Sequence, residues 1–335
     1  MLKPSRTVKQ PPNLFDRTQK LVNSIEEING QPLIAYWNAW NGSICPNDVP
    51  GMFQLFNRIG DLDKAALFIK SDGGHIESAL RLVHLIRRHV KHLTAFVSAE
   101  CASAATIMAL GADEIRMGPL GYLTPIDSSL IHEMSPIDAI SNRRVSVSRD
   151  ELIRVVKLWT DNSKEHHANP YSDLFQYVHP LVFGAIDRSN SLSVKVCDEV
   201  LSYHINDAEE RARIATELNS EFPSHAYPIT EVAARRLGLK VNDLDVETNN
   251  LLLELSECYS EMAQRAITDF DESNYHDNQI LGITEGRNIQ IYYQNDKDLN
   301  YIKDERRWQA LNDESSWHKV ELVNGKKTIS RLHIS

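Results

Sequence analysis

Short apolar runs alternate with stretches of helical periodicity through the first third of the chain. Runs typical of buried strands lie at residues 32–37, 65–69 and 93–98. Between the last two runs, apolar side chains recur at helical spacing from Ile76 to Ile86, with arginines at 81, 87 and 88 on the other face. This rhythm of strand and helix predicts an α/β fold, with a mostly parallel sheet and right-handed helical crossovers.

The pattern changes along the chain and predicts four parts. Residues 1–30 are polar and predict a loosely attached leader, followed by a main domain at 31–245. Residues 246–268 carry one apolar stripe and predict an amphipathic helix, after which an acidic link leads into 270–335. That last part alternates with a period of two and contains Asn324-Gly325, a type I′ hairpin signal, so we expect a small β-rich C-terminal appendage outside the main domain.

Composition and charge narrow the possible classes of function. The 335 residues are 42% hydrophobic and 24% charged, which is typical of a globular protein. A formal net charge of −10, without a dense basic cluster, argues against nucleic acid and anionic membranes as partners. A spanning helix needs ~20 predominantly apolar residues, and no run qualifies, so we expect no integral membrane segment. Four widely spaced cysteines and the lack of an apolar signal-peptide core favour a cytoplasmic protein with reduced thiols.

Two strand ends carry residues suited to chemistry. The segment 71–74 (Ser-Asp-Gly-Gly) follows the second run, and the small residues 99–105 around Ser103 follow the third. Paired glycines leave N–H groups bare for an anionic oxygen, and the start of a helix also favours an oxyanion. Because parallel strands end at the same sheet edge, we expect Gly73-Gly74 and Ser103 to be neighbours there. Taken separately, Ser103 could be only an N-cap and the glycines only a turn.

The surroundings of Ser103 differ from the G-x-S-x-G elbow of α/β-hydrolases, because Cys101 and Ala105 stand where its glycines belong. The Ser-Asp-Gly-Gly segment with Ser103, 29 residues after Gly74, resembles instead the ClpP and signal-peptide-peptidase-A peptidases. Over about residues 30–245 the chain looks most similar to the serine dehydrogenase proteinase family. That similarity rests on the segments 101–115, 118–119, 123–127, 179–181, 222–229 and 237–239, with Arg188 and Ala233.

This resemblance implies a ClpP/crotonase-like fold and a serine peptidase that forms an acyl-enzyme on Ser103. It also implies an oxyanion hole at the Gly73-Gly74 turn, with the backbone N–H groups of Gly74 and Ala104 as donors. Peptides or proteins would be the substrates. Neither a dinucleotide-binding G-x-G-x-x-G segment nor a P-loop is present in the sequence, so we expect no cofactor and no metal, and any ATP dependence would need a separate partner.

The general base is left open by the sequence. Where ClpP-like enzymes keep a histidine after the serine, this chain has Asp127, 24 residues beyond Ser103. His179 starts a long predicted helix, and with Asp127 as its orienter it would complete a Ser-His-Asp constellation. Lys195, within the same helix, and His225, in a Pro-Ser-His loop, are alternative bases. Each of the three also has a structural interpretation, as a helix cap, a solvated lysine and a turn histidine respectively.

Other functions and features compete with the peptidase hypothesis. A crotonase-type acyl-CoA enzyme shares the fold and the glycine-built oxyanion hole but needs no serine at this helix start, and a catalytically inactive scaffold of the same fold is a third hypothesis. We expect a homo-oligomer, because the predicted helix 173–204 and the 246–268 stripe present more apolar surface than one subunit easily covers. His166-His167 fits a polar loop better than a metal site, and Cys101 fits a small buried hydrophobe.

Overall fold

The chain divides into two compact units. A computed structural model describes residues 8–126, 129–138, 140, 143–162 and 169–334. Unit 1 comprises Met1–Leu123 and Ile229–Ser335, and unit 2 comprises Thr124–Pro228. The predicted main domain 31–245 is therefore divided, because the residues of unit 2 pack mainly among themselves while the C-terminal part joins the beginning of the chain.

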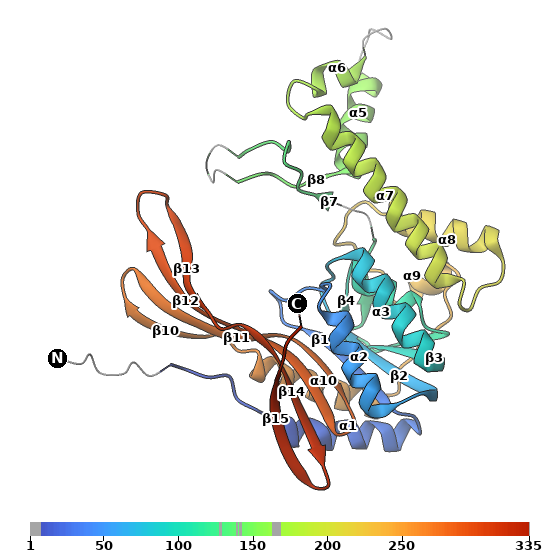
Figure 1. Ribbon diagram of the computed structural model, residues 1–335. Coiled ribbons are helices and arrows are strands. Elements are labelled where there is room, and N and C mark those ends of the chain that lie inside the picture. The colour runs from blue at the N-terminus through green and yellow to red at the C-terminus, as the bar shows by residue number, and fades with distance from the viewer. Residues whose placement is uncertain (1–7, 127–128, 139, 141–142, 163–168, 335) are drawn as a thin grey trace. The chain divides into compact units, whose positions relative to one another are not determined.

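A large mixed sheet forms the framework of unit 1 (Figure 1), and 11 strands of the described chain belong to it. Its parallel part has the order β1 (Leu33–Asn38), β2 (Leu62–Lys70), β3 (Val90–Val97), β5 (Glu114–Met117) and β9 (Val241–Asp243). Its antiparallel part is β11 (Asn274–Gly286), β12 (Ile289–Ile302), β14 (Ser316–Val323) and β15 (Lys326–Leu332), with β10 (Ala266–Asp271) beside β11 and β13 (Arg307–Asp313) beside β12. The α/β class is confirmed, although the sheet is mixed and only its first part is parallel.

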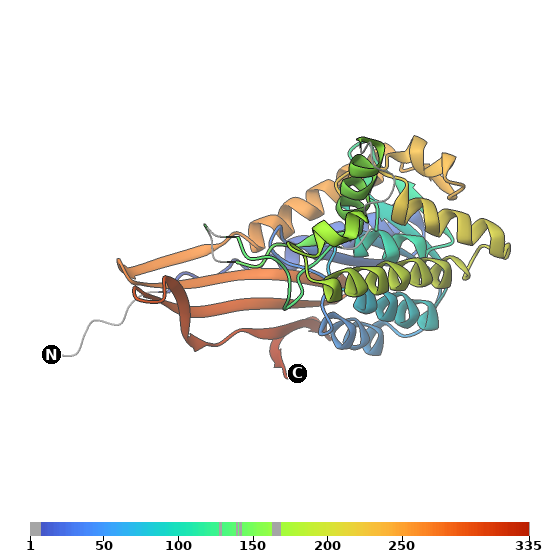
Figure 2. The same ribbon diagram turned by 90° about the horizontal axis from the view of Figure 1, so that it is seen from above.

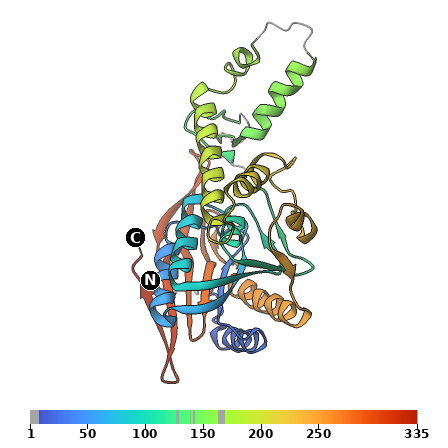
Figure 3. The ribbon, with the colours of Figure 1, turned by 90° about the vertical axis from the view of Figure 1, so that its right-hand side faces the viewer.

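Helices cover both faces of this sheet (Figure 3). The helices α1 (Phe15–Asn29) and α10 (Val246–Met262) lie side by side on one face. The helices α2 (Asp48–Ile59) and α3 (Ile76–His89) lie on the other, where the short α4 (Ala104–Leu110) packs against α3. Unit 1 also contains α9 (Glu231–Arg236) and the small parallel pair β4 (Glu100–Cys101) and β6 (Tyr122–Leu123).

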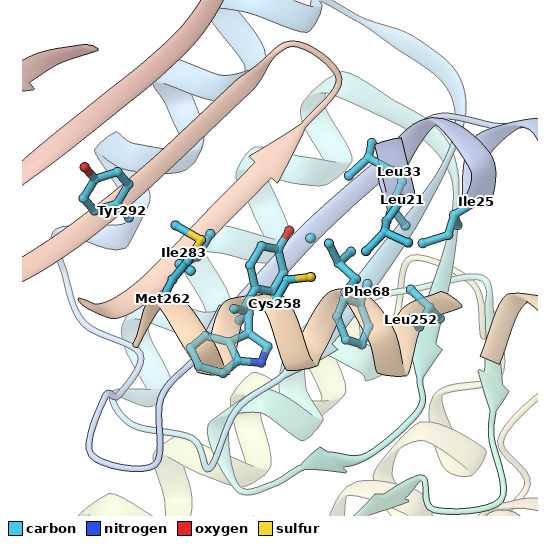
Figure 4. Close-up of a cluster of buried hydrophobic side chains, with 14 of the residues drawn as sticks. Leu21, Ile25, Leu33, Phe68, Leu252, Cys258, Met262, Ile283 and Tyr292 are labelled. Carbon is cyan, nitrogen blue, oxygen red and sulfur yellow. The ribbon is translucent and has the colours of Figure 1, made fainter. Parts of the chain in front are cut away.

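The hydrophobic core under α1 and α10 corrects two predictions (Figure 4). Leu21 and Ile25 of α1 pack with Leu252 and Met262 of α10, so most of the expected loose leader is a core helix. Its apolar residues recur at helical spacing between the polar ones, and fully burying each one contributes about 1.5–3 kcal/mol. The 246–268 stripe is buried within the same chain, so it does not supply the expected interface.

The C-terminal strands correct a third prediction. Strand β11 pairs antiparallel with β1, so residues after 270 extend the main sheet and do not form a separate appendage. Figure 2 shows β11 and β12 continuing beyond the helix-covered part of the sheet. The hairpin prediction is confirmed: Asn324 and Gly325, with φ of 51° and 75°, join β14 to β15.

Unit 2 is mainly helical. It contains β7 (Ser129–Leu130), β8 (Val147–Ser148), α5 (Arg149–Asn162), α6 (Pro170–Leu174), α7 (Pro180–Leu201) and α8 (Ala208–Ser220). The predicted helix 173–204 is divided, because Pro180 starts a new helix at a position where no backbone donor is needed. Leu158, Tyr177 and Leu181 are exposed apolar side chains. Side chains of this kind are what an interface of the predicted homo-oligomer would bury, and the oligomer stays a prediction. No helix among the described residues of the chain is long and apolar enough to cross a membrane.

A buried carboxyl group joins α1 to the sheet. Glu285 of β11 is fully buried and accepts hydrogen bonds from Thr18 Oγ1 (2.7 Å), Gln19 Nε2 (2.6 Å) and Gln290 Nε2 (2.5 Å). Burial raises the pKa of Glu285 from 4.5 to about 7, although the hydrogen bonds oppose this shift. The folded protein therefore binds this proton more tightly than the unfolded chain does.

We predict that Glu285 makes the protein less stable as the pH rises from about 4.5 to about 7, because ionisation is more costly in the folded state. A shift of this size corresponds to about 3 kcal/mol of unfolding free energy. Glu285→Gln should remove that part of the decline in urea denaturation measured across a pH series, whereas the exposed Glu247→Gln should retain it. Buried Asp48, whose pKa is raised to about 6 by burial, supplies a remaining slope of the same sign. An identical slope in Glu285→Gln and wild type would contradict the prediction.

Candidate active site

The ends of β2 and β3 meet at the carboxyl edge of the parallel strands. After β2 the chain enters the turn 71–74, and after β3 it enters β4 and reaches Ser103. The two segments are hydrogen-bonded to each other: Ser71 N–H donates to Glu100 O (3.1 Å), and Ala102 N–H donates to Ser71 O (2.9 Å). The structure thus places the Gly73-Gly74 turn and Ser103 side by side.

Both glycines of the turn are required by space and by backbone conformation. A Cβ on Gly73 would lie 2.7 Å from Ser103 Cβ and 2.8 Å from Ala102 O. A Cβ on Gly74 would lie 2.4 Å from Ile44 O. The φ angles are +103° at Gly73 and +146° at Gly74, a region that residues with side chains rarely adopt.

The hydrogen bonds of the turn decide which amides can bind an anion. Gly73 N–H donates to Ser71 Oγ (3.1 Å), and Gly73 O accepts from Ile44 N–H (2.8 Å). Gly73 belongs to the turn of the expected oxyanion hole, but its own amide is already used, so its contribution is steric. Within the described part of the chain, the N–H groups of Gly74 and Ala104 donate to no protein acceptor, so both can bind an oxygen.

Ser103 itself has a strained backbone. Its φ of 53° and ψ of −122° are rare for a residue with a side chain, and such conformations cost about 1–3 kcal/mol. It precedes α4, but its side chain makes no capping hydrogen bond to that helix. The side chain of half-buried Ser103 therefore does not act as the cap of α4, and its Cβ lies beside the Gly73-Gly74 turn.

The candidate bases His179, Lys195 and His225 belong to unit 2, whereas Ser103 belongs to unit 1. His179 caps α7, where its Nδ1 accepts from Leu181 N–H (3.2 Å). Lys195 is exposed on α7.

His225 is exposed and lines a polar pocket of about 400 Å³ with Asp150 and Glu151, among other residues. Asp127 and the pair at 166–167 lie outside the described residues.

A partly buried ion pair beside the turn was missed by sequence reasoning. Lys70 Nζ lies 2.9 Å from Glu100 Oε1, donates to Asn38 O (3.1 Å) and lies 5.0 Å from the centroid of the Trp37 ring. The ion pair holds the pKa of Glu100 below its usual value, although burial acts the other way. A lysine that ends an apolar run directly before Ser71 was the available signal. Its ammonium group is committed to these partners, which disfavours a role as base.

Cys101 lies between this ion pair and Ser103 in the sequence. It is fully buried, and burial raises the pKa of its thiol well above the ordinary value. A thiol that stays protonated is a poor nucleophile, so Cys101 is a small buried hydrophobe, as predicted. Among the described residues, no group of three or more His, Cys, Asp or Glu could hold a metal ion.

Comparisons with known proteins give distant similarities. No family model matches the chain. An uncharacterised protein of Methanocaldococcus jannaschii is 24% identical over 207 residues, which make up 61% of this chain and 62% of that relative. Two mutant structures of the membrane-bound stomatin-specific protease 1510-N, one of them in complex with a substrate peptide, are 14% identical, with TM-scores of 0.38. They cover 70% of this chain and 84% and 80% of theirs.

We predict that glycine relieves the strain at position 103. Ser103→Gly should unfold at a higher denaturant concentration than Ser103→Ala, by about 1 kcal/mol, because alanine keeps the unfavourable φ of 53°. Chemical denaturation of the two variants, both of which lack the hydroxyl, measures the difference directly. At Gln294, an ordinary strand position of β12, the order should reverse and alanine should be the more stable. Equal stability of the two Ser103 variants would show that the backbone strain is absent.

Proposed function

We propose that this chain is a serine hydrolase that cleaves peptide bonds through an acyl-enzyme on Ser103, with the N–H groups of Gly74 and Ala104 as its oxyanion hole. The observation that carries the proposal is the strained Ser103 in contact with Gly73, in a site where the amides of Gly74 and Ala104 have no acceptor among the described residues. Backbone strain at a single polar residue is typical of functional sites. The assignment to a ClpP/crotonase-like fold and to the serine dehydrogenase proteinase family is part of this proposal and is supported by the sequence motifs.

The proposed reaction follows from these positions. Ser103 Oγ attacks the substrate carbonyl carbon while a base takes its proton, and the carbonyl oxygen becomes an anion held by the two amides. The C–N bond then breaks, and the base returns the proton to the leaving amine. Water hydrolyses the remaining ester by the same steps. Because the amides are fixed before the substrate arrives, they need no reorganisation when the charge develops.

Chain connectivity favours His225 over His179 as the base. Leu123 and Ile229 form a bridge in unit 1, and Leu123 pairs with Cys101 in the β4–β6 ladder. His225 precedes Ile229 by four residues, and Asp127 follows Leu123 by four. At no more than about 3.6 Å per residue, the backbone of His225 lies within about 14 Å of Ile229.

The described state of His179 disfavours it further. Its Nδ1 accepts the Leu181 N–H, so neutral His179 carries its proton on Nε2 and has no lone pair left for Ser103. It would have to leave the cap of α7 to act as a base. Lys195 is exposed, whereas a lysine base must be desolvated to be neutral near pH 7. We therefore propose His225 as the base and Asp127 as its orienter, with His179 and Lys195 as alternatives.

We predict that a fluorophosphonate probe labels the wild-type protein on Ser103 and leaves Ser103→Ala unlabelled, because the probe needs both an activated hydroxyl and the oxyanion hole. Mass spectrometry of the labelled peptide identifies the residue. Ser98→Ala is a matched control, because Ser98 is a buried serine in the same loop that is not assigned to the site. A wild-type protein without label that binds immobilised coenzyme A would favour the crotonase alternative, and one that does neither would favour the inactive scaffold.

We predict that His225→Ala lowers kcat for a peptide or ester substrate by the ~10²–10⁴-fold that removal of a general base costs. Asp127→Asn should be nearly as harmful, because it removes the group that orients the imidazole. His179→Ala should leave kcat close to wild type and lower stability through the lost cap. An inactive His179→Ala or Lys195→Ala protein, together with an active His225→Ala protein, would transfer the role of base.

A further inference from the structure

Two buried side chains connect the end of β1 to the oxyanion turn. Ser71 Oγ donates to Asn38 Oδ1 (2.6 Å) and accepts from Gly73 N–H (3.1 Å). The side chains are almost without solvent contact, since Asn38 is 2% exposed and Ser71 is 0% exposed. Strands β1 and β2 are parallel neighbours with Trp37 opposite Lys70, so the next residue of each, Asn38 and Ser71, lie side by side beyond that pair.

We call the hydrogen bonds Asn38–Ser71 and Ser71–Gly73 the relay. Chemistry determines which atom donates in each of them. The Asn38 Oδ1 atom can only accept, so the single hydroxyl proton of Ser71 goes to it and an oxygen lone pair of Ser71 remains for Gly73 N–H. Breaking either bond would leave a buried polar atom unsatisfied, at a cost of about 1–3 kcal/mol. The peptide before Gly73 is thereby held in one orientation, and Gly74 supplies the next N–H of the chain.

The two ends of the relay are themselves held. Lys70 Nζ donates to the backbone oxygen of Asn38 (3.1 Å) and pairs with Glu100 (2.9 Å), whose backbone oxygen accepts from Ser71 N–H. On the other side of the turn, Ile44 N–H donates to Gly73 O (2.8 Å), and Ile44 O accepts from His75 N–H (2.9 Å). Hydrogen bonds thus hold the Gly73-Gly74 turn on both sides, and the relay supplies two of them.

We propose that Asn38 and Ser71 are positioning residues, which hold the Gly73 peptide so that Gly74 N–H can donate to the oxyanion. This inference rests on the proposed function. Neither side chain touches the substrate; both act through the backbone of the turn. Their contribution is to the transition state, in which the carbonyl oxygen carries charge, and not to ground-state binding of the substrate.

The kinetic test uses Ser71→Ala in the whole 335-residue chain with an activated ester substrate. Removal of an oxyanion donor costs about 10²–10³ in kcat, so a displaced donor should cost about 10- to 100-fold, with KM within about 2-fold of wild type. Asn38→Asp keeps an acceptor oxygen and should retain more activity than Asn38→Ala. Ser193→Ala is the matched control, because Ser193 is also fully buried and donates to an asparagine, Asn219 Oδ1 (2.5 Å), in unit 2. It should lower stability similarly and leave kcat unchanged.

A second measurement follows the relay without using activity. Hydrogen exchange of the Gly73 amide should be at least about 10-fold faster in Ser71→Ala than in wild type or Ser193→Ala, because the amide loses its acceptor. A lower kcat at constant KM together with faster Gly73 exchange would support the proposal. Wild-type kcat in a folded Ser71→Ala protein would overturn it and leave the proposed hydrolase intact. A wild-type protein that neither hydrolyses esters nor reacts with the fluorophosphonate would overturn the proposed function and the positioning role with it.

Discussion

The close approach of Gly73 to Ser103 is the constraint on which the candidate site depends. Only a hydrogen atom fits between the turn and the serine, because a Cβ on Gly73 would lie 2.7 Å from Ser103 Cβ. That approach requires β2 and β3 to be adjacent and in register, and their parallel pairing, with Phe68 opposite Phe96, provides this. The two hydrogen bonds of Ser71 with Glu100 and Ala102 continue the register into the loops. The geometry of the candidate site is therefore a continuation of the sheet.

Maintaining this geometry lowers stability locally. Ser103 has an unfavourable backbone conformation, and the turn needs buried polar side chains whose desolvation must be offset by hydrogen bonds. The sheet core supplies the offset, because α1 and α10 bury one face against Phe68 and Ile283. Local strain held by a well-packed surround is common where a protein's function requires a geometry that the chain alone would avoid.

The turn and Ser103 could be predicted from the sequence because few residue types fit backbone positions of this kind. Glycines at 73 and 74 and small residues around Ser103 each point to a close backbone approach. Features that depend on contacts between distant parts of the chain could not be predicted from the sequence. The pairing of β11 with β1 depends on contacts between residues about 250 positions apart, such as Ala35 with Glu285, and no local pattern contains it. The apolar residues of α1, such as Leu21 and Ile25, recur at helical spacing in the sequence. The many polar residues between them led to the prediction of a polar leader.

Asn38 and Ser71 illustrate a different limit. A serine and an asparagine at strand ends are ordinary surface residues in a sequence, and only the burial of both shows that they bond each other and the turn. Unit 1 thus contains the proposed nucleophile and both proposed oxyanion donors, whereas each proposed base belongs to unit 2. Removing a base still leaves a serine esterase the rate enhancement of its oxyanion hole, about 10³–10⁴-fold over water in the best-studied triads. In the proposed mechanism, the oxyanion donors of the turn are therefore a source of catalysis separate from the base.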